Sequence, residues 1–192
     1  FNEIPAGIRV PFFYVEFDNS RASSSAAQFK TLLIGQKLAA GTAEKETRLD
    51  VSSPAQAEID FGAGSQLARM VTAFRETNSL GQCEAIALDD NASGVAATGS
   101  VAITGTATAN GILSVVIGGS LIQAGVSNAD TASDIGDALE AAVNAKTSLG
   151  FTASNSAGVV TITARNKGEA GNDALIVLNK FSGEVTPAGL TI

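Results

Sequence analysis

Two short apolar runs separated by a helical stretch organise the first half of the chain. Residues 31–35 and 84–88 are nearly continuous apolar segments, a pattern typical of strands that are buried on both faces. Residues 47–51 alternate between apolar and polar side chains, which indicates an edge or half-buried strand. Between the runs, an apolar stripe with i, i+3, i+4, i+7 spacing predicts a helix: Leu67, Met70, Val71 and Phe74. The pattern therefore predicts a βαβ unit with two parallel strands and a right-handed crossover.

A helix start and a helix break are expected within this unit. Residues 53–56 place serine at the cap, proline at the first helical position and glutamine three residues after the serine, which is a capping-box pattern. Residues 62–65 contain two glycines and match half of a dinucleotide-binding fingerprint. That fingerprint needs a strand before it and a third glycine, whereas helix-forming residues precede it and Leu67 takes the third position. We therefore interpret residues 62–65 as a break between two helical segments.

The second half of the chain, after the linker-like residues 91–94, is rich in Ala, Gly, Ser and Thr and predicts mainly strands. Strands are expected over residues 100–108, 112–117, 121–126, 151–154, 159–165 and 174–178, with turns at 110–111, 118–119 and 155–158. One helix is expected from Asp130 or Thr131 until Gly150. Its apolar stripe consists of Ile135, Ala138, Leu139, Ala142 and Val143. This order predicts an antiparallel sheet with one helix on one face.

The first thirty residues form an extended, aromatic-rich arm followed by a loop. Pro5 and Pro11 bracket a stretch that cannot be helical, and residues 10–17 favour β structure. The arm has two interpretations: an edge strand of its own domain, or a strand lent to a neighbouring molecule. In the second interpretation the contact residues are Val10, Phe12, Phe13, Tyr14, Val15 and Phe17.

Composition removes several classes of function. The net charge is −7 and no basic patch stands out, so nucleic-acid binding has little support. No apolar run approaches the roughly 18–20 residues that span a bilayer, so no membrane partner is expected. The chain has no histidine, which excludes Ser-His-Asp triads and His-ligated metals. A single cysteine, Cys83, precludes an internal disulfide and is expected to be a packed, inert thiol.

Two polar segments remain as candidate sites. Asp89 and Asp90 follow a buried strand, where they could bind a metal or act as an acid–base pair, or simply begin a solvated loop. Residues 166–173 could ligate calcium, but their spacing does not match an EF-hand, and turn conformations explain their glycines and asparagines. We therefore predict no catalytic residues, no metal ligands and no cofactor.

Eight short blocks along the chain are similar, in order, to one family of proteins. The blocks are residues 1–5 (FNEIP), 8–11 (IRVP), 14–21 (YVEFDNSR), 32–36 (LLIGQ), 64–70 (GSQLARM), 85–90 (AIALDD), 113–119 (LSVVIGG) and 161–168 (TITARNKG). Over nearly its whole length the chain resembles the tail sheath proteins of Mu-like contractile-tailed phages. The first six blocks resemble the amino-terminal segment and the blocks that follow it, and the last two resemble the family's inserted domain.

The resemblance implies a structural subunit and not an enzyme. Sheath subunits polymerise as a helical tube around the inner tail tube, and contraction drives that tube into the host envelope. The implied partners are further copies of the chain, the tail tube protein, and the baseplate and tail terminator proteins. The implied location is the virion tail, with the host cytoplasm during assembly. In this family terminal arms link neighbouring subunits by strand sharing, which agrees with the second interpretation of the arm.

The resemblance also implies a division into domains. The expected fold class is α/β plus α+β, with an arm at 1–30, a βαβ-containing core portion at 31–90 and an inserted β-rich domain at 91–185. Because sheath proteins are generally much longer, the chain is expected to be a fragment, with 186–192 as the start of a carboxy-terminal part. The chain also starts at Phe1 and not at methionine, so we expect that an upstream piece has been removed.

A carbohydrate- or surface-binding module is the alternative function from another class. Its Gly- and Thr-rich strands would give a similar pattern. Sugar sites usually stack the ligand on Trp or Tyr, but the chain has no Trp and its single Tyr, Tyr14, lies in the arm.

Overall fold

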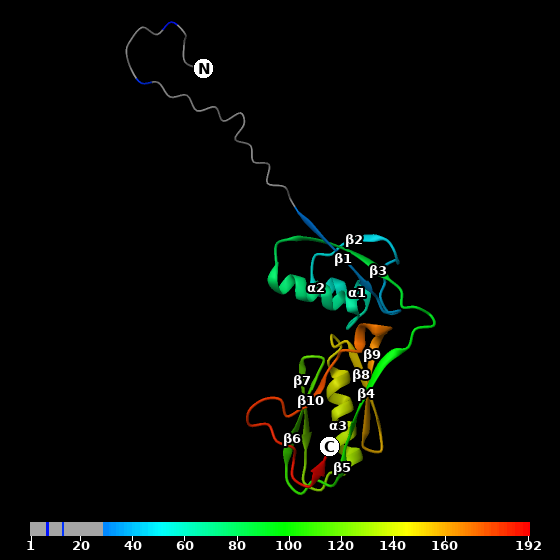
Figure 1. The fold of residues 1–192 in the computed structure, drawn as a ribbon, viewed down its shortest axis with the longest axis vertical. Coiled ribbons are helices and arrows are strands. Elements are labelled where there is room, and N and C mark those ends of the chain that lie inside the picture. Colours follow the sequence, from blue (N-terminus) through cyan, green and yellow to red (C-terminus); the bar gives the residue numbers. More distant parts are fainter. Residues whose placement is uncertain (1–6, 8–12, 14–28) are drawn as a thin grey trace.

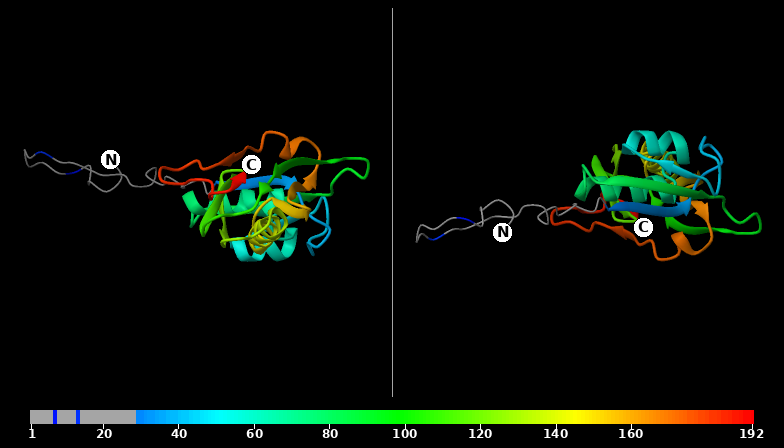
Figure 2. Two further views of the ribbon diagram at one scale, coloured as in Figure 1. Left: turned by 90° about the horizontal axis from the view of Figure 1, so that it is seen from below. Right: turned by 90° about the horizontal axis from the view of Figure 1, so that it is seen from above.

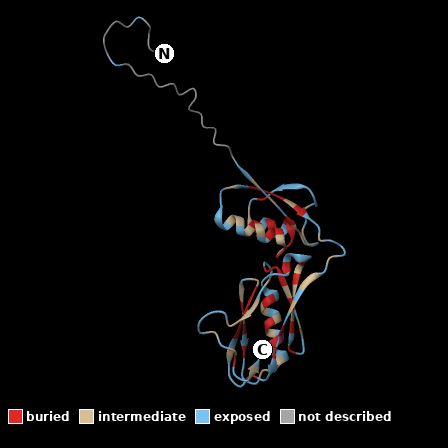
Figure 3. Cartoon of the chain, in the orientation of Figure 1, coloured by how far each residue is buried: buried red, intermediate tan, exposed pale blue. Residues whose placement is uncertain are grey.

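The computed structural model describes Gly7, Phe13 and residues 29–192. These residues form a mixed α/β structure with three α-helices and several small sheets (Figure 1). Buried residues gather in two places, one within residues 29–90 and one within residues 91–192 (Figure 3). We call these two segments the amino-terminal part and the carboxy-terminal part.

The amino-terminal part is a three-stranded sheet with two helices on the same side (Figures 1 and 2). Its elements are β1 (Lys30–Gln36), β2 (Arg48–Asp50), α1 (Pro54–Phe61), α2 (Gln66–Thr77) and β3 (Gln82–Leu88). The strand order is β1-β3-β2; β1 is parallel to β3, and β2 is antiparallel to it. The expected parallel pairing of the two apolar runs and the edge position of residues 47–51 are therefore confirmed.

The helices begin and end at residues that the sequence singles out. The Ser53 hydroxyl accepts a hydrogen bond from the Gln56 backbone N–H at 3.2 Å, and Pro54 is the first residue of α1. The reciprocal half of the capping box is absent, because the Gln56 side chain donates instead to Asp60 at 2.9 Å. Helix α1 ends at Phe61, and Ser65 caps α2, so the predicted break at residues 62–65 is confirmed.

The core of the amino-terminal part lies between the sheet and its helices. The buried residues are Val51, Ala57, Phe61, Leu67, Ala68, Val71, Ala85 and Ala87. Only Leu67 and Val71 of the predicted helical stripe are fully enclosed, whereas Met70 and Phe74 are half-buried. The predicted stripe therefore faces the core, but its fully buried part is narrower than the spacing predicts, because Met70 and Phe74 keep part of their surface in solvent.

The carboxy-terminal part contains two three-stranded antiparallel sheets. Its elements are β4 (Ala96–Ala102), β5 (Thr104–Gly105), β6 (Gly111–Ile117), β7 (Ser120–Val126), α3 (Ala132–Ala145), β8 (Phe151–Ser156), β9 (Val159–Lys167), β10 (Ile176–Leu178) and β11 (Leu190–Thr191). One sheet has the order β10-β6-β7 and the other β4-β9-β8, while β5 pairs with β11. Helix α3 contacts β7 of the first sheet and β8 and β9 of the second (Figure 1). The prediction of a single sheet under one helix is therefore wrong, because each sheet turns an apolar face toward α3.

Local turn signals predict two hairpins correctly and one wrongly. Gly118 and Gly119 both have positive φ, as a tight turn requires, and they join β6 to β7. The turn between β8 and β9 lies within the predicted segment 155–158, at Ala157 and Gly158, which also have positive φ. The segment 110–111 is not a hairpin turn, because β4 pairs with β9 and not with β6. Asn110 instead accepts a hydrogen bond from the Asn128 N–H at 2.7 Å through its side-chain oxygen.

Helix α3 begins where the sequence predicts. Thr131 is the N-cap, and Thr131 and Asp134 form a complete capping box, in which the Asp134 carboxylate accepts from the Thr131 N–H at 2.9 Å. The predicted stripe packs into the core, with Ile135, Leu139 and Val143 fully buried. The helix ends at Ala145 and not near Gly150, so its predicted end is wrong.

Candidate interaction surface

Most of the predicted contact residues of the arm lie outside the described residues. These are Val10, Phe12, Tyr14, Val15 and Phe17. The sixth, Phe13, is described and is 89% exposed. The contact role of the arm therefore stays a prediction.

One side of the β1-β3-β2 sheet has no helix over it among the described residues (Figure 2). We call this side the open face. Residues that pair directly across a sheet share a face, so the register assigns to it Lys30, Leu32, Ile34, Gln36, Arg48, Asp50, Gln82, Glu84, Ile86 and Leu88. Leu32 is 47% exposed and Ile34 is 51% exposed. The prediction that residues 31–35 are buried on both faces is therefore wrong.

The helix-covered side of β1 explains why only one face is buried. Gly35 lies against α2, where a Cβ atom would be only 3.1 Å from the Met70 sulfur and 3.5 Å from the Leu67 Cα. On this side of β1, Gly35 is buried and Thr31 and Leu33 are half-buried, whereas Leu32 and Ile34 point away from the helices. An apolar run indicates a strand, but it does not tell how many of its faces are covered.

The open face has an apolar half. Ile34 of β1 lies opposite Ile86 of β3, and Leu32 and Leu88 flank this pair. Leu88 is also exposed, and Ile86 is half-buried. Single exposed apolar residues are normal, but neighbouring ones on one sheet face are typical of a surface that contacts another protein.

The open face also has a charged half, which centres on Glu84. This residue of the middle strand is buried, with the Lys30 ammonium 2.8 Å from one carboxylate oxygen and the Arg48 guanidinium 3.3 Å from the other. Hydrogen bonding to Lys30 lowers the pKa of the Glu84 carboxyl below its usual value, and Arg48 adds to this effect. The same hydrogen bond raises the pKa of Lys30. Glu84 therefore connects all three strands electrostatically.

We expect Glu84→Gln to reduce the acid sensitivity of the fold. Because the folded-state pKa of Glu84 is lowered, its contribution to stability is complete above the unfolded-state pKa and is lost as the pH falls through the lowered value. The variant lacks this loss, so its free energy of unfolding falls less between neutral and acidic pH. Urea denaturation at a series of pH values measures the difference.

Glu76→Gln is the control, because Glu76 is exposed and makes no ion pair among the described residues. Equal pH profiles for Glu84→Gln and the wild type would contradict the role of the ion pairs.

The other polar candidates hold the structure together. Asp89 lies 3.4 Å from Lys45 and 3.9 Å from Lys37. Asp90 accepts hydrogen bonds from residues of the carboxy-terminal part, so it does not merely begin a solvated loop. In the described part of the chain, no group of three or more His, Cys, Asp or Glu residues is placed to hold a metal. Burial raises the pKa of the Cys83 thiol, as expected for a packed cysteine.

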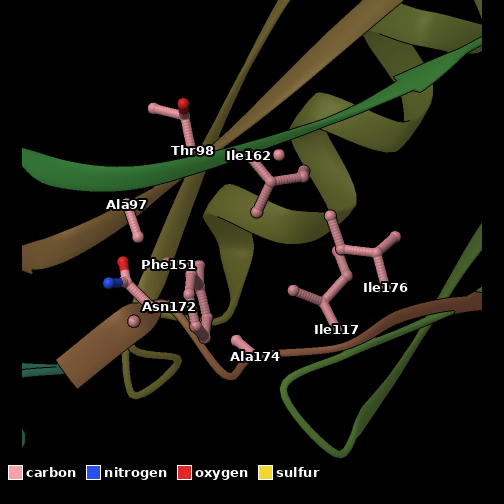
Figure 4. Close-up of a pocket in the computed structure, with 10 residues that line it drawn as sticks. Ala97, Thr98, Ile117, Phe151, Ile162, Asn172, Ala174 and Ile176 are labelled. Atoms are coloured by element: carbon pink, nitrogen blue, oxygen red, sulfur yellow. The ribbon is translucent and has the colours of Figure 1, made fainter. Parts of the chain in front are cut away.

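A small cavity lies in the carboxy-terminal part where β4 approaches β10 (Figure 4). Its volume is about 200 Å³, and Ile117, Phe151, Ile162 and Ile176 supply most of its apolar lining. The polar side chains at its wall are Thr98 and Asn172, and no acidic, basic or thiol group lines it. This composition is suited to packing and not to acid–base chemistry.

Residues 166–173, the second polar candidate, do not form one continuous loop. Asn166 and Lys167 are the last residues of β9, and a short 3-10 helix follows at Glu169–Gly171.

In the described part of the chain, no helix is both long and apolar enough to span a membrane.

Comparison with known proteins places these features in a family context. No protein-family model matches the chain. The chain is 42% identical to the Mu-like prophage FluMu tail sheath protein of Haemophilus influenzae, over 99% of this chain. The match spans 39% of the length of that relative. The chain is thus related along nearly its whole length to a tail sheath protein of a Mu-like prophage, which confirms the resemblance found in its sequence blocks.

Proposed function

We propose that the chain is part of a structural subunit of a contractile phage tail sheath. The observation that carries this proposal is the 42% identity to a tail sheath protein over 99% of the chain. The subunit polymerises around the tail tube, and its contraction drives the tube through the host envelope. Its role is mechanical and not catalytic.

The proposal includes a division of labour along the chain. Residues 31–90 and 91–185 act as separate domains, a division supported by their two separate hydrophobic clusters. Residues 1–30 are a linking arm, in which Val10, Phe12, Phe13, Tyr14, Val15 and Phe17 pair with a neighbouring subunit. The partners are further copies of the protein, the tail tube protein, and the baseplate and terminator proteins. The protein resides in the virion tail after assembly in the host cytoplasm.

The open face gives this assembly a specific contact. Its apolar half is too exposed to stabilise the amino-terminal part by itself, and its charged half limits which surfaces can approach. In the proposed sheath this face packs against another subunit. Burial of Leu32 and Ile34 then contributes about 25 cal/mol per Å² of apolar area removed from water.

Substitution of Ile34 by arginine tests the proposal. The complete reading frame that contains this chain is expressed with the adjacent tail tube protein and imaged by negative-stain electron microscopy. We expect wild-type protein to form sheaths, and Ile34→Arg to fold normally but form none, because the subunit contact would bury an unpaired charge.

Ile59→Arg is the matched control, because Ile59 is exposed on α1, on the other side of the sheet. Absence of sheaths in the wild type would contradict the proposed function itself. Normal sheaths from Ile34→Arg would contradict a contact between subunits at this face. So would an Ile34→Arg subunit that unfolds at a lower urea concentration than the wild type, because the loss of sheaths would then reflect a loss of folding.

A further inference from the structure

The carboxyl end of β9 contacts the amino-terminal part through the buried side-chain amide of Asn166. Asn166 is only 6% exposed, although it lies next to the end of its strand. Its side-chain oxygen accepts a hydrogen bond from the Gln66 backbone N–H at 2.7 Å. Its side-chain nitrogen donates to the Lys37 carbonyl at 3.2 Å and to the Asp90 carboxylate at 3.0 Å. All three partners belong to the amino-terminal part.

These three bonds define the orientation of the Asn166 side chain. Both amide hydrogens and the amide oxygen have partners, so a rotated or displaced amide would leave buried polar groups unpaired. Gln66 is the first residue of α2, where backbone N–H groups have no partner within the helix. Asn166 therefore completes the start of a helix that belongs to the other part of the protein.

Neighbouring contacts hold the backbone of β9 in the same place. The Lys167 N–H donates to the second Asp90 carboxylate oxygen at 2.9 Å, and the Lys167 carbonyl accepts from the Gln36 side chain at 3.0 Å. At Gly64 the two backbones touch directly, since a Cβ atom there would lie 2.4 Å from the Leu149 carbonyl oxygen. No side chain can be inserted at this point without separating the two parts.

Residues 89–95 connect β3 to β4, and of these, residues 91–95 are the covalent link between the two parts; such a single crossing by itself permits rotation. We infer that Asn166 and Asp90 form a polar junction that holds the carboxy-terminal part in one orientation on the amino-terminal part. A displacement of one part is then transmitted to the other, and the segment 91–95 does not act as a hinge. This inference stands on the contacts alone and does not depend on the proposed function.

Distances between spin labels on the two parts test the junction. The labels are attached to cysteines at Ala55 of α1 and Ala141 of α3, both exposed, with the buried Cys83 replaced by alanine. We expect the 192-residue chain to give one narrow distance distribution by pulsed electron paramagnetic resonance. Asn166→Ala removes the three bonds and is expected to broaden the distribution and to shift its centre.

Asn155→Ala is the matched control for Asn166→Ala. The Asn155 side chain also makes three hydrogen bonds, to Ser133, Asp137 and Gly158, but all of them lie within the carboxy-terminal part. We expect this variant to keep the narrow distribution. An equal broadening in Asn155→Ala would overturn the inference, because it would reflect a general loss of packing.

A second variant keeps the test decisive if Asn166→Ala unfolds. Asp90→Ala removes the acceptor of Asn166 and Lys167 from the amino-terminal side and leaves the carboxy-terminal part unchanged. We expect it to broaden the distribution while hydrogen exchange in α3 remains slow. A narrow, unshifted distribution in Asp90→Ala and in every folded Asn166 variant would overturn the inference.

Discussion

Leu139→Asp is expected to unfold the carboxy-terminal part while the amino-terminal part keeps most of its protection. Leu139 is fully buried on α3 within the core that both antiparallel sheets share with this helix. The substitution removes core volume and buries a carboxylate without a partner, at a cost of about 4 kcal/mol or more. Hydrogen exchange by mass spectrometry measures the effect, with fast exchange expected over residues 91–192.

The junction adds a detail to this result. The Asn166 side-chain oxygen accepts a hydrogen bond from the Gln66 N–H in the first turn of α2. Because Leu139→Asp removes this acceptor when the carboxy-terminal part unfolds, we expect that turn to exchange faster as well. Ala141→Asp is the control, since Ala141 is exposed on the same helix. Unchanged protection of the carboxy-terminal part in Leu139→Asp would mean that its core does not depend on this helix face. Loss of protection along the whole chain would show that the two parts unfold as one unit.

Deletion of residues 1–20 from the complete protein is expected to leave both parts folded but to prevent stable sheath. Pro5 and Pro11 favour an extended entry, and residues 12–17 carry more apolar side chains than a free tail should expose. In an extended strand Phe13, Val15 and Phe17 share one face, which a neighbouring sheet edge would bury. Such a link would tolerate rotation between subunits, which the proposed contraction requires.

Electron microscopy of the deletion variant, expressed with its tail tube protein, measures this effect. The control replaces residues 18–20 by glycines, which keeps the length of the arm and its apolar residues. We expect the control to form normal sheaths. Sheaths of normal length from the deletion variant would refute strand sharing and would return the arm to an edge strand of its own domain.

Features that depend on neighbouring residues were predictable from the sequence. The start of α3 follows from Thr131 and Asp134, because a capping box needs only residues three positions apart. The β6–β7 turn follows from Gly118 and Gly119, because few residues accept positive φ. The buried stripe of α3 follows from periodicity alone. The cap and the turn depend on residues at most three positions apart, and the stripe depends only on the helix period of about 3.6 residues.

The candidate surface could be predicted only in part. The sequence identified residues 31–35 as a strand, and the register with β3 then places Leu32 and Ile34 on one face. Their exposure depends on where both helices pack, and an apolar run is the same for one covered face or two. The sequence likewise does not show that Asp90 accepts hydrogen bonds from Asn166 and Lys167, because these partners follow more than seventy positions later.

The sequence by itself determined the βαβ order of the amino-terminal part, the single helix of the carboxy-terminal part, and the relation to tail sheath proteins. The tertiary structure alone decided that β4 pairs with β9, that the strands of the carboxy-terminal part divide into two three-stranded sheets and one two-stranded sheet, and that a buried asparagine joins the two parts. The physical reason is range: caps, turns and stripes are selected by local backbone geometry. Strand partners and buried polar contacts are selected by which distant surfaces can satisfy each other once the chain has collapsed.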